Sequence, residues 1–163
     1  MKLQSYENIL FFNLYSFSAI FNAQEKIFGE YKNEFDERLI LNSDHTFEYF
    51  WNFDLASSWN IGTWKIEGGK YIYLKLNEIK DTLKSENKVE IVLSSDKISN
   101  EITNNEYVLN VISGGGQSRN LPPKKLFFKD NKLFTFSKIG KIQNKKIKSL
   151  MNPMINSKPW FEK

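Results

Sequence analysis

Apolar and polar residues alternate most clearly between residues 46 and 53. The aromatic side chains on one face of this segment are Phe47, Tyr49, Trp51 and Phe53. Alternation with a period of two is typical of a β-strand with one buried face. A segment with three apolar residues, Leu39, Ile40 and Leu41, precedes it at residues 38–42, and the turn-forming residues Ser43, Asp44 and His45 lie between the two. The pattern therefore predicts a hairpin from residue 38 to residue 53.

A second hairpin is predicted from residue 59 to residue 76. Gly68 and Gly69 separate its two segments, 59–67 and 70–76, and paired glycines suit a tight turn with positive φ angles. The apolar positions of the first segment change phase, from Trp59 and Ile61 to Trp64 and Ile66. We expect a β-bulge or a sharp bend at Gly62, where the phase changes.

The rest of the chain is less regular. Residues 78–83 fit a short strand or a helical turn, residues 89–93 and 106–112 fit strands, and residues 94–105 fit a loop. Residues 126–136 fit a third hairpin, and the lysine-rich residues 145–163 fit an extended tail. Consecutive hairpins favour a mainly β fold, an antiparallel meander that curls into a barrel or half-barrel, since closure removes exposed strand edges.

Several short motifs occur in a characteristic order. They are Gly29-Glu30-Tyr31, Leu39-Ile40-Leu41, Asp44-His45-Thr46-Phe47, Gly62-Thr63-Trp64 and Ile72-Tyr73-Leu74. This order resembles small bacterial exported lipocalin-like domains over residues 27–76. The resemblance implies a fold rather than an activity, because such folds carry unrelated functions. His45 stands where the family pattern has glycine, so we expect a positive φ angle there.

An uncharged apolar run covers residues 9–21, and the small residue Ala23 follows it. The run is too short to span a membrane but has the length of a signal-peptide core. The alternative is a buried N-terminal strand or helix. The predicted organisation is a signal peptide at 1–23, a lipocalin-like domain at 24–145 and a C-terminal tail at 146–163. We expect a soluble exported protein, periplasmic or secreted, with no membrane-spanning segment in the mature chain.

Composition narrows the choice of partners and chemistry. The 163 residues carry a net charge of +4, and arginine occurs only at Arg38 and Arg119. Lysine reads phosphates and base edges less well than arginine does, so a nucleic-acid partner is disfavoured. The absence of cysteine excludes disulfides, thiolate chemistry, cysteine-ligated zinc and a lipid anchor on an N-terminal cysteine. With His45 as the single histidine, we expect no metal and no cofactor.

The best binding candidates are aromatic. They are Phe47, Tyr49, Trp51, Phe53, Trp59 and Trp64. Inside a barrel these rings could line a cavity for an apolar ligand, and the alternative is ordinary core packing. We therefore predict a non-enzymatic domain that binds a small apolar ligand or a protein partner.

Two alternatives stay open. One is a hydrolase that uses a pair of strand-end carboxylates, with the candidates Asp44, Glu48, Asp54 and Glu67. The other is a module that binds a polyanion or a membrane surface through the lysine-rich tail, with the candidates Lys141, Lys145, Lys146 and Lys148. The segment 114–119 is glycine-rich, but Pro122 and Pro123 block the helix that a phosphate-binding loop requires, so we expect a mobile loop.

Overall fold

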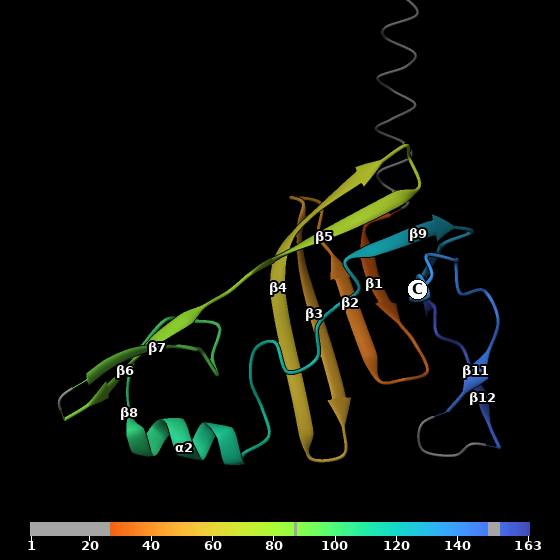
Figure 1. Cartoon of the computed structure of the whole chain (residues 1–163). Helices are drawn as coiled ribbons and strands as arrows, with labels where there is room; N and C mark the ends of the chain where they lie inside the picture. Colours follow the sequence, from red (N-terminus) through yellow and green to blue (C-terminus); the bar gives the residue numbers. More distant parts are fainter. Residues whose placement is uncertain (1–26, 87, 150–153) are drawn as a thin grey trace, which may run out of the picture.

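The computed structural model describes residues 27–86, 88–149 and 154–163. Eight antiparallel strands form a closed barrel (Figure 1). In order around the barrel they are β1 (Gly29–Lys32), β2 (Glu37–Leu41), β3 (Thr46–Phe53), β4 (Ala56–Glu67), β5 (Tyr71–Asn77), β9 (Lys125–Lys129), β10 (Lys132–Phe134) and β13 (Phe161–Glu162). Each strand lies beside the next one of the set, which is the up-and-down arrangement of lipocalin barrels. The expected signal peptide, residues 1–23, lies outside the described residues.

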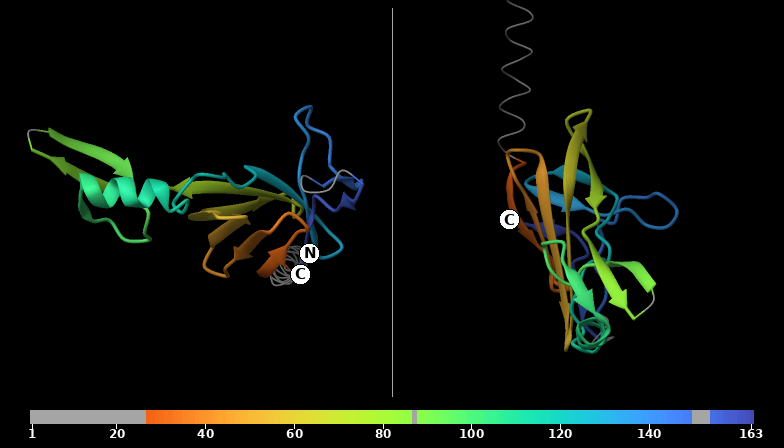
Figure 2. Two further views of the ribbon diagram at one scale, coloured as in Figure 1. Left: turned by 90° about the horizontal axis from the view of Figure 1, so that it is seen from below. Right: turned by 90° about the vertical axis from the view of Figure 1, so that its left-hand side faces the viewer.

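Two insertions interrupt the meander. Between β5 and β9 lie β6 (Lys80–Ser85), β7 (Lys88–Leu93), β8 (Glu101–Thr103) and α2 (Asn104–Ile112). Between β10 and β13 lie β11 (Ile147–Lys148) and β12 (Asn156–Ser157). The first insertion projects from one side of the barrel and the second lies on the opposite side (Figures 1 and 2). The barrel thus separates two accessory units.

The predicted hairpins are confirmed. β2 pairs with β3, β4 with β5 and β9 with β10. His45 has a φ angle of 65°, and Gly68 and Gly69 have φ angles of 58° and 66°. The indole Nε1 of Trp64 donates a hydrogen bond to the carbonyl oxygen of Asn42 at 3.0 Å. This bond ties the second hairpin to the β2–β3 turn.

The bulge predicted at Gly62 is not present. Gly62 pairs with Phe47 on one side and Leu76 on the other, and the register continues through it without an extra residue. The apolar phase changes because the interior positions before Gly62 are the buried polar residues Ser58 and Asn60. A polar interior position looks solvent-facing in a sequence, so the pattern suggested a bulge that the strand pairing lacks.

The strand predicted at residues 106–112 is wrong, because these residues form most of α2. A reciprocal cap starts the helix. The Glu106 amide donates to Thr103 Oγ1 at 3.4 Å, and the Thr103 amide donates to Glu106 Oε2 at 2.7 Å. This Thr-x-x-Glu capping box is a helix-start motif in the sequence that outweighs the strand preference of the valines and isoleucine.

The glycine-rich segment 114–119 was expected to be a mobile loop, but its residues 114–118 lie along β4. The amides of Ser57 and Trp59 donate to the carbonyl oxygens of Gly114 and Gly116 at 3.0 and 3.2 Å. A Cβ on Gly114 would lie 2.8 Å from the Leu55 carbonyl oxygen. The glycines therefore allow this backbone to approach the part of β4 that extends beyond β5.

The segment expected as a C-terminal tail contributes a barrel strand. Within β13, Glu162 pairs with Lys32 of β1 and with Lys132 of β10, and Phe161 is fully buried. Without β13, the facing edges of β1 and β10 would each lack a partner, which is an unfavourable state for exposed strands. Closure of the barrel therefore depends on β13, a strand of only two residues, which is too short to show an alternation pattern in the sequence.

Glu162 also provides a pH-dependent contribution to stability. Hydrogen bonds from Lys132, Trp160 and Lys158 lower its pKa to about 2 from 4.5. Because the folded-state pKa is depressed, the stabilisation is present above about pH 4.5 and is lost as the pH falls towards 2. At pH 7 we expect Glu162→Gln to lower the free energy of unfolding by about 1 kcal/mol after solvent screening. In urea denaturation the difference should vanish near pH 2, and a pH-independent difference would contradict this assignment.

Candidate functional site

The middle of the barrel is filled by side chains. The buried apolar cluster consists of Ile27, Tyr31, Leu39, Leu41, Phe47, Tyr49, Trp64, Ile72, Leu74, Leu126, Leu133 and Phe161. Interior side chains fill barrels of eight strands unless a ligand cavity is left open. Any ligand site of this barrel must therefore lie towards one of its ends.

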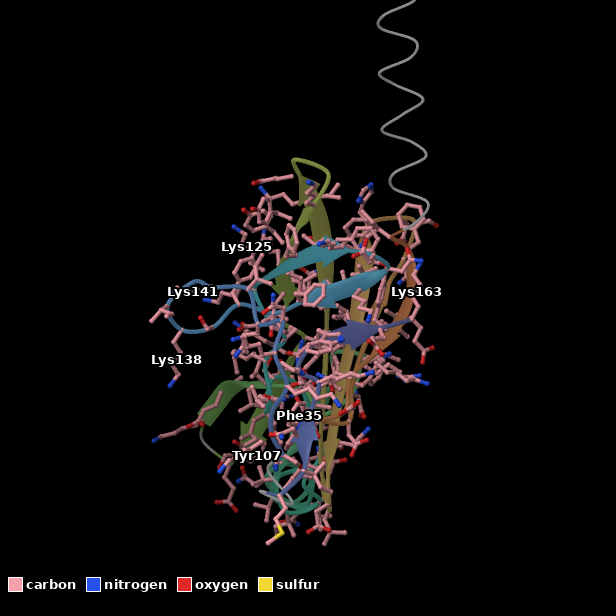
Figure 3. The ribbon with its side chains drawn as sticks, turned by 90° about the vertical axis from the view of Figure 1, so that its right-hand side faces the viewer. Phe35, Tyr107, Lys125, Lys138, Lys141 and Lys163 are labelled. Atoms are coloured by element: carbon pink, nitrogen blue, oxygen red, sulfur yellow. The ribbon has the colours of Figure 1, made fainter. Side chains whose placement is uncertain are left out.

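A cavity of about 550 Å³ lies at the end of the barrel that carries the β1–β2 and β3–β4 turns. Its volume falls within the roughly 300–1,000 Å³ of typical small-molecule sites. The apolar residues that line it are Phe35, Trp51, Phe53, Leu121, Pro123, Ile147 and Pro159. Phe35 comes from the β1–β2 turn (Figure 3) and Ile147 from β11, so barrel turns and the second insertion share the wall.

Trp51 and Phe53 provide the flat part of the wall. Both lie at the end of β3, two residues apart, so their side chains point to the same face of the strand. Their rings stack with an interplanar angle of 4° and a centroid separation of 6.0 Å. Phe53, at the end of β3, is 38% exposed, whereas Phe47, near the start of the same strand, is buried. The interior aromatic row of β3 therefore runs from the core out into the cavity.

A partly buried polar network adjoins the cavity, and Glu37 and Asn120 belong to both. The Tyr49 hydroxyl donates to Glu37 Oε1 at 2.9 Å and accepts from Asn120 Nδ2 at 3.3 Å. Asn60 Nδ2 donates to the Asn120 carbonyl oxygen at 2.9 Å. Desolvation, and next the nearby charge of Glu37, raise the pKa of Tyr49 well above its usual range. Tyr49 therefore keeps its proton and serves as a hydrogen-bond donor to Glu37, which also lines the cavity.

The charge around the cavity is mainly negative. Four carboxylates line it, those of Glu34, Asp36, Glu37 and Asp54, and Lys148 is the lysine among the lining residues. Asp36 and Asp54 have positive φ angles of 56° and 53° at the two turns. Aspartate tolerates that conformation better than most residues. The turns thus place acidic groups at the rim because their backbone geometry favours such residues.

The six aromatic residues predicted to bind a ligand divide into three groups. Trp51 and Phe53 line the cavity, and Phe47, Tyr49 and Trp64 belong to the buried cluster. Trp59 alternates with the interior residues Ser58 and Asn60, and its Nε1 donates to the Ser95 carbonyl oxygen of the first insertion at 2.9 Å. Sequence reasoning missed the other cavity residues, because they come from turns and insertions that have no periodic pattern.

The candidate carboxylates lie apart. Asp44 and Asp54 occupy the turns at opposite ends of β3, Glu48 pairs with Lys97, and Glu67 pairs with Lys65 at 2.6 Å. Hydrogen bonds, from Thr46 and from Lys65, lower the pKa values of Asp44 and Glu67. A general acid needs a raised value, so these two groups do not suit that role.

The remaining candidates lie on the surface. The His45 ring packs against Trp64 with 4.8 Å between ring centroids, and no group of three or more metal-ligating side chains occurs within residues 27–86, 88–149 and 154–163. Lys141, Lys145, Lys146 and Lys148 are exposed. Figure 3 shows Lys138 and Lys141 on a loop that stands away from the barrel. Exposed lysines are typical of solvated charges, and of the four candidates Lys148 also lines the cavity.

Comparison of the chain with protein-family models, with curated proteins and with solved structures finds no match. In the part of the chain that the structure describes, no helix has the length and apolar character needed to cross a membrane.

Proposed function

We propose that the chain is a non-enzymatic binding protein that takes up a small, mainly apolar ligand at the end of the barrel. The observation that carries this proposal is the cavity of about 550 Å³ beside the stacked rings of Trp51 and Phe53. Rings held in parallel give a flat ligand a large contact area with little loss of side-chain entropy.

The charges at the rim restrict the ligand further. Carboxylates of Glu34, Asp36 and Asp54 face the same cavity as the Trp51 ring. An anionic ligand would meet like charges there, whereas a neutral or cationic ligand would not. The proposed ligand is therefore a flat apolar molecule that is neutral or carries a positive charge.

Titration with N-phenyl-1-naphthylamine, a neutral aromatic probe whose fluorescence rises in apolar sites, tests the proposal. We expect saturable binding, and we expect Trp51→Ala to weaken it about fivefold, since a stacked ring contributes about 1 kcal/mol. The anionic probe 8-anilinonaphthalene-1-sulfonate should bind more weakly than the neutral one.

Phe50→Ala is the matched control. Phe50 lies on β3 between Tyr49 and Trp51 but points outward, where Arg38 sits 4.4 Å from its ring centroid. Binding should be unchanged in this variant. Equal losses in the Phe50 and Trp51 variants, or no saturable binding of the neutral probe, would contradict the proposal.

We also propose that the protein is exported. The apolar run at residues 9–21 and the small residue Ala23 support a cleaved signal peptide. N-terminal sequencing of the protein recovered from the cell envelope or the medium should begin at Gln24. Recovery of the intact N-terminus from the cytoplasm would exclude this part of the proposal.

A further inference from the structure

Large apolar side chains gather on the first insertion. Of the seventeen exposed large apolar residues in the described ranges, eight lie between residues 89 and 112. They are Val89, Ile91, Leu93, Ile98, Val108, Leu109, Val111 and Ile112. Contiguous apolar surface on a soluble protein often marks an interface, so the exposed apolar rows of this insertion are candidate contact surfaces.

Within this insertion, β7 is an edge strand. The sheet has the order β7-β6-β8, so β7 has β6 as its neighbour on one side and no neighbouring strand on the other. It is six residues long, whereas the other strands with a single partner in the described ranges have two or three residues. Edges of this length are usually protected by proline, a bulge or inward charges. The sequence of β7, KVEIVL, has no proline and pairs with β6 without a bulge, and its charged residues Lys88 and Glu90 lie on the face of Leu83, away from Val89, Ile91 and Leu93.

The two faces of the β7-β6-β8 sheet differ in how far their apolar side chains are exposed. Leu83 of β6 is 7% exposed and lies on one face. The other face holds Val89, Ile91 and Leu93, which are 66%, 64% and 42% exposed. Alternate residues of a strand share a face, so these three side chains form one uncovered apolar row along the free edge.

The row is self-complementary. In an antiparallel pair related by a two-fold axis perpendicular to the sheet, a register centred on Ile91 places Ile91 opposite its own copy. It also places Val89 opposite Leu93 of the second copy, so all three apolar residues meet apolar partners. A register centred on Glu90 would instead place two glutamates directly opposite each other, which is unfavourable.

We propose that two copies of this chain pair antiparallel through β7, in the register centred on Ile91, and form a continuous six-stranded sheet. This proposal does not depend on the ligand site. A contact made by one strand of this length lies at the small end of protein interfaces, so the expected dissociation constant is micromolar, about 10 µM. Sedimentation velocity of the full chain between about 1 and 200 µM should therefore show a shift from monomer to dimer.

Substitution of Ile91 by lysine tests the apolar row. We expect Ile91→Lys to weaken dimerisation at least about tenfold, because it places two like charges opposite each other. Ile98→Lys is the matched control, since Ile98 is 71% exposed in the same insertion but lies outside β7. A wild-type protein that stays monomeric over the whole concentration range would overturn the proposal. So would an equal loss in both variants.

A cysteine variant tests the register. The chain has no cysteine, so a single introduced thiol reports on one position. Ile91→Cys should form a disulfide-linked dimer under mild oxidation, because directly opposed residues lie about 4.5–5.5 Å apart. Glu90→Cys should react much more slowly, because in the proposed register its copies are diagonal neighbours about 7–8 Å apart. Faster cross-linking at residue 90 than at residue 91 would overturn the register.

Discussion

Replacement of Gly62 by alanine is expected to lower the free energy of unfolding by about 3 kcal/mol. A Cβ at this position would lie 2.0 Å from the Lys75 carbonyl oxygen and 2.7 Å from Phe47 Cε1. The oxygen belongs to β5 and the ring to the buried cluster, so neither can move without disturbing the sheet or the core. Chemical denaturation followed by circular dichroism would measure the loss.

Gly115→Ala is the control for this substitution. Its added Cβ would meet the Ser57 hydroxyl at 3.4 Å, which is an ordinary contact with a side chain that can move. We expect a change within about 0.5 kcal/mol, as for most surface substitutions. If the two alanine variants proved equally stable, the close approach of β5 to Gly62 would not have the energetic importance assigned to it.

Replacement of Phe161 by alanine should cost about 3–5 kcal/mol, the usual range for a fully buried phenylalanine. Its side chain is 0% exposed within the core cluster, and its backbone pairs with Leu133 of β10. The substitution leaves a void beside the strand that closes the barrel. A domain of this size has about 5–15 kcal/mol of stability, so the variant would lose a large share of it.

Thermal unfolding of Phe161→Ala should therefore begin at a clearly lower temperature than in the wild type. Ile139→Ala serves as the comparison, because Ile139 is 77% exposed in the loop after β10. A substitution there should leave the unfolding temperature almost unchanged. A small effect at Phe161 would mean that β13 is dispensable for the barrel.

The sequence allowed the prediction of the strands that alternate and of the turns that need special backbone angles. Residues 46–53 fall on β3 as expected, and His45 takes the positive φ angle that its place in the turn requires. Both features are local, because side-chain alternation and turn geometry depend on a few neighbouring residues. Local information was sufficient for the meander from β2 to β5.

Features that depend on distant residues were harder to predict. Asn60 is buried because Ser118 and Asn120, about sixty residues later, supply its hydrogen-bond partners. A buried asparagine has no recognisable pattern until those partners are known. The same holds for the cavity, where Trp51 belonged to the predicted set but Phe35 and Leu121 are brought in by a turn and an insertion.

The seam between β1 and β13 has a consequence for how the chain folds. It joins Lys32 to Glu162, at opposite ends of the described chain, by a single pair of residues. Contacts between residues so distant form slowly, because a long loop must close before they contribute. The hairpins should therefore assemble first and the seam last. Until then the edges of β1 and β10 stay open, so a slow final step would let an open intermediate accumulate, and that intermediate would be prone to aggregation.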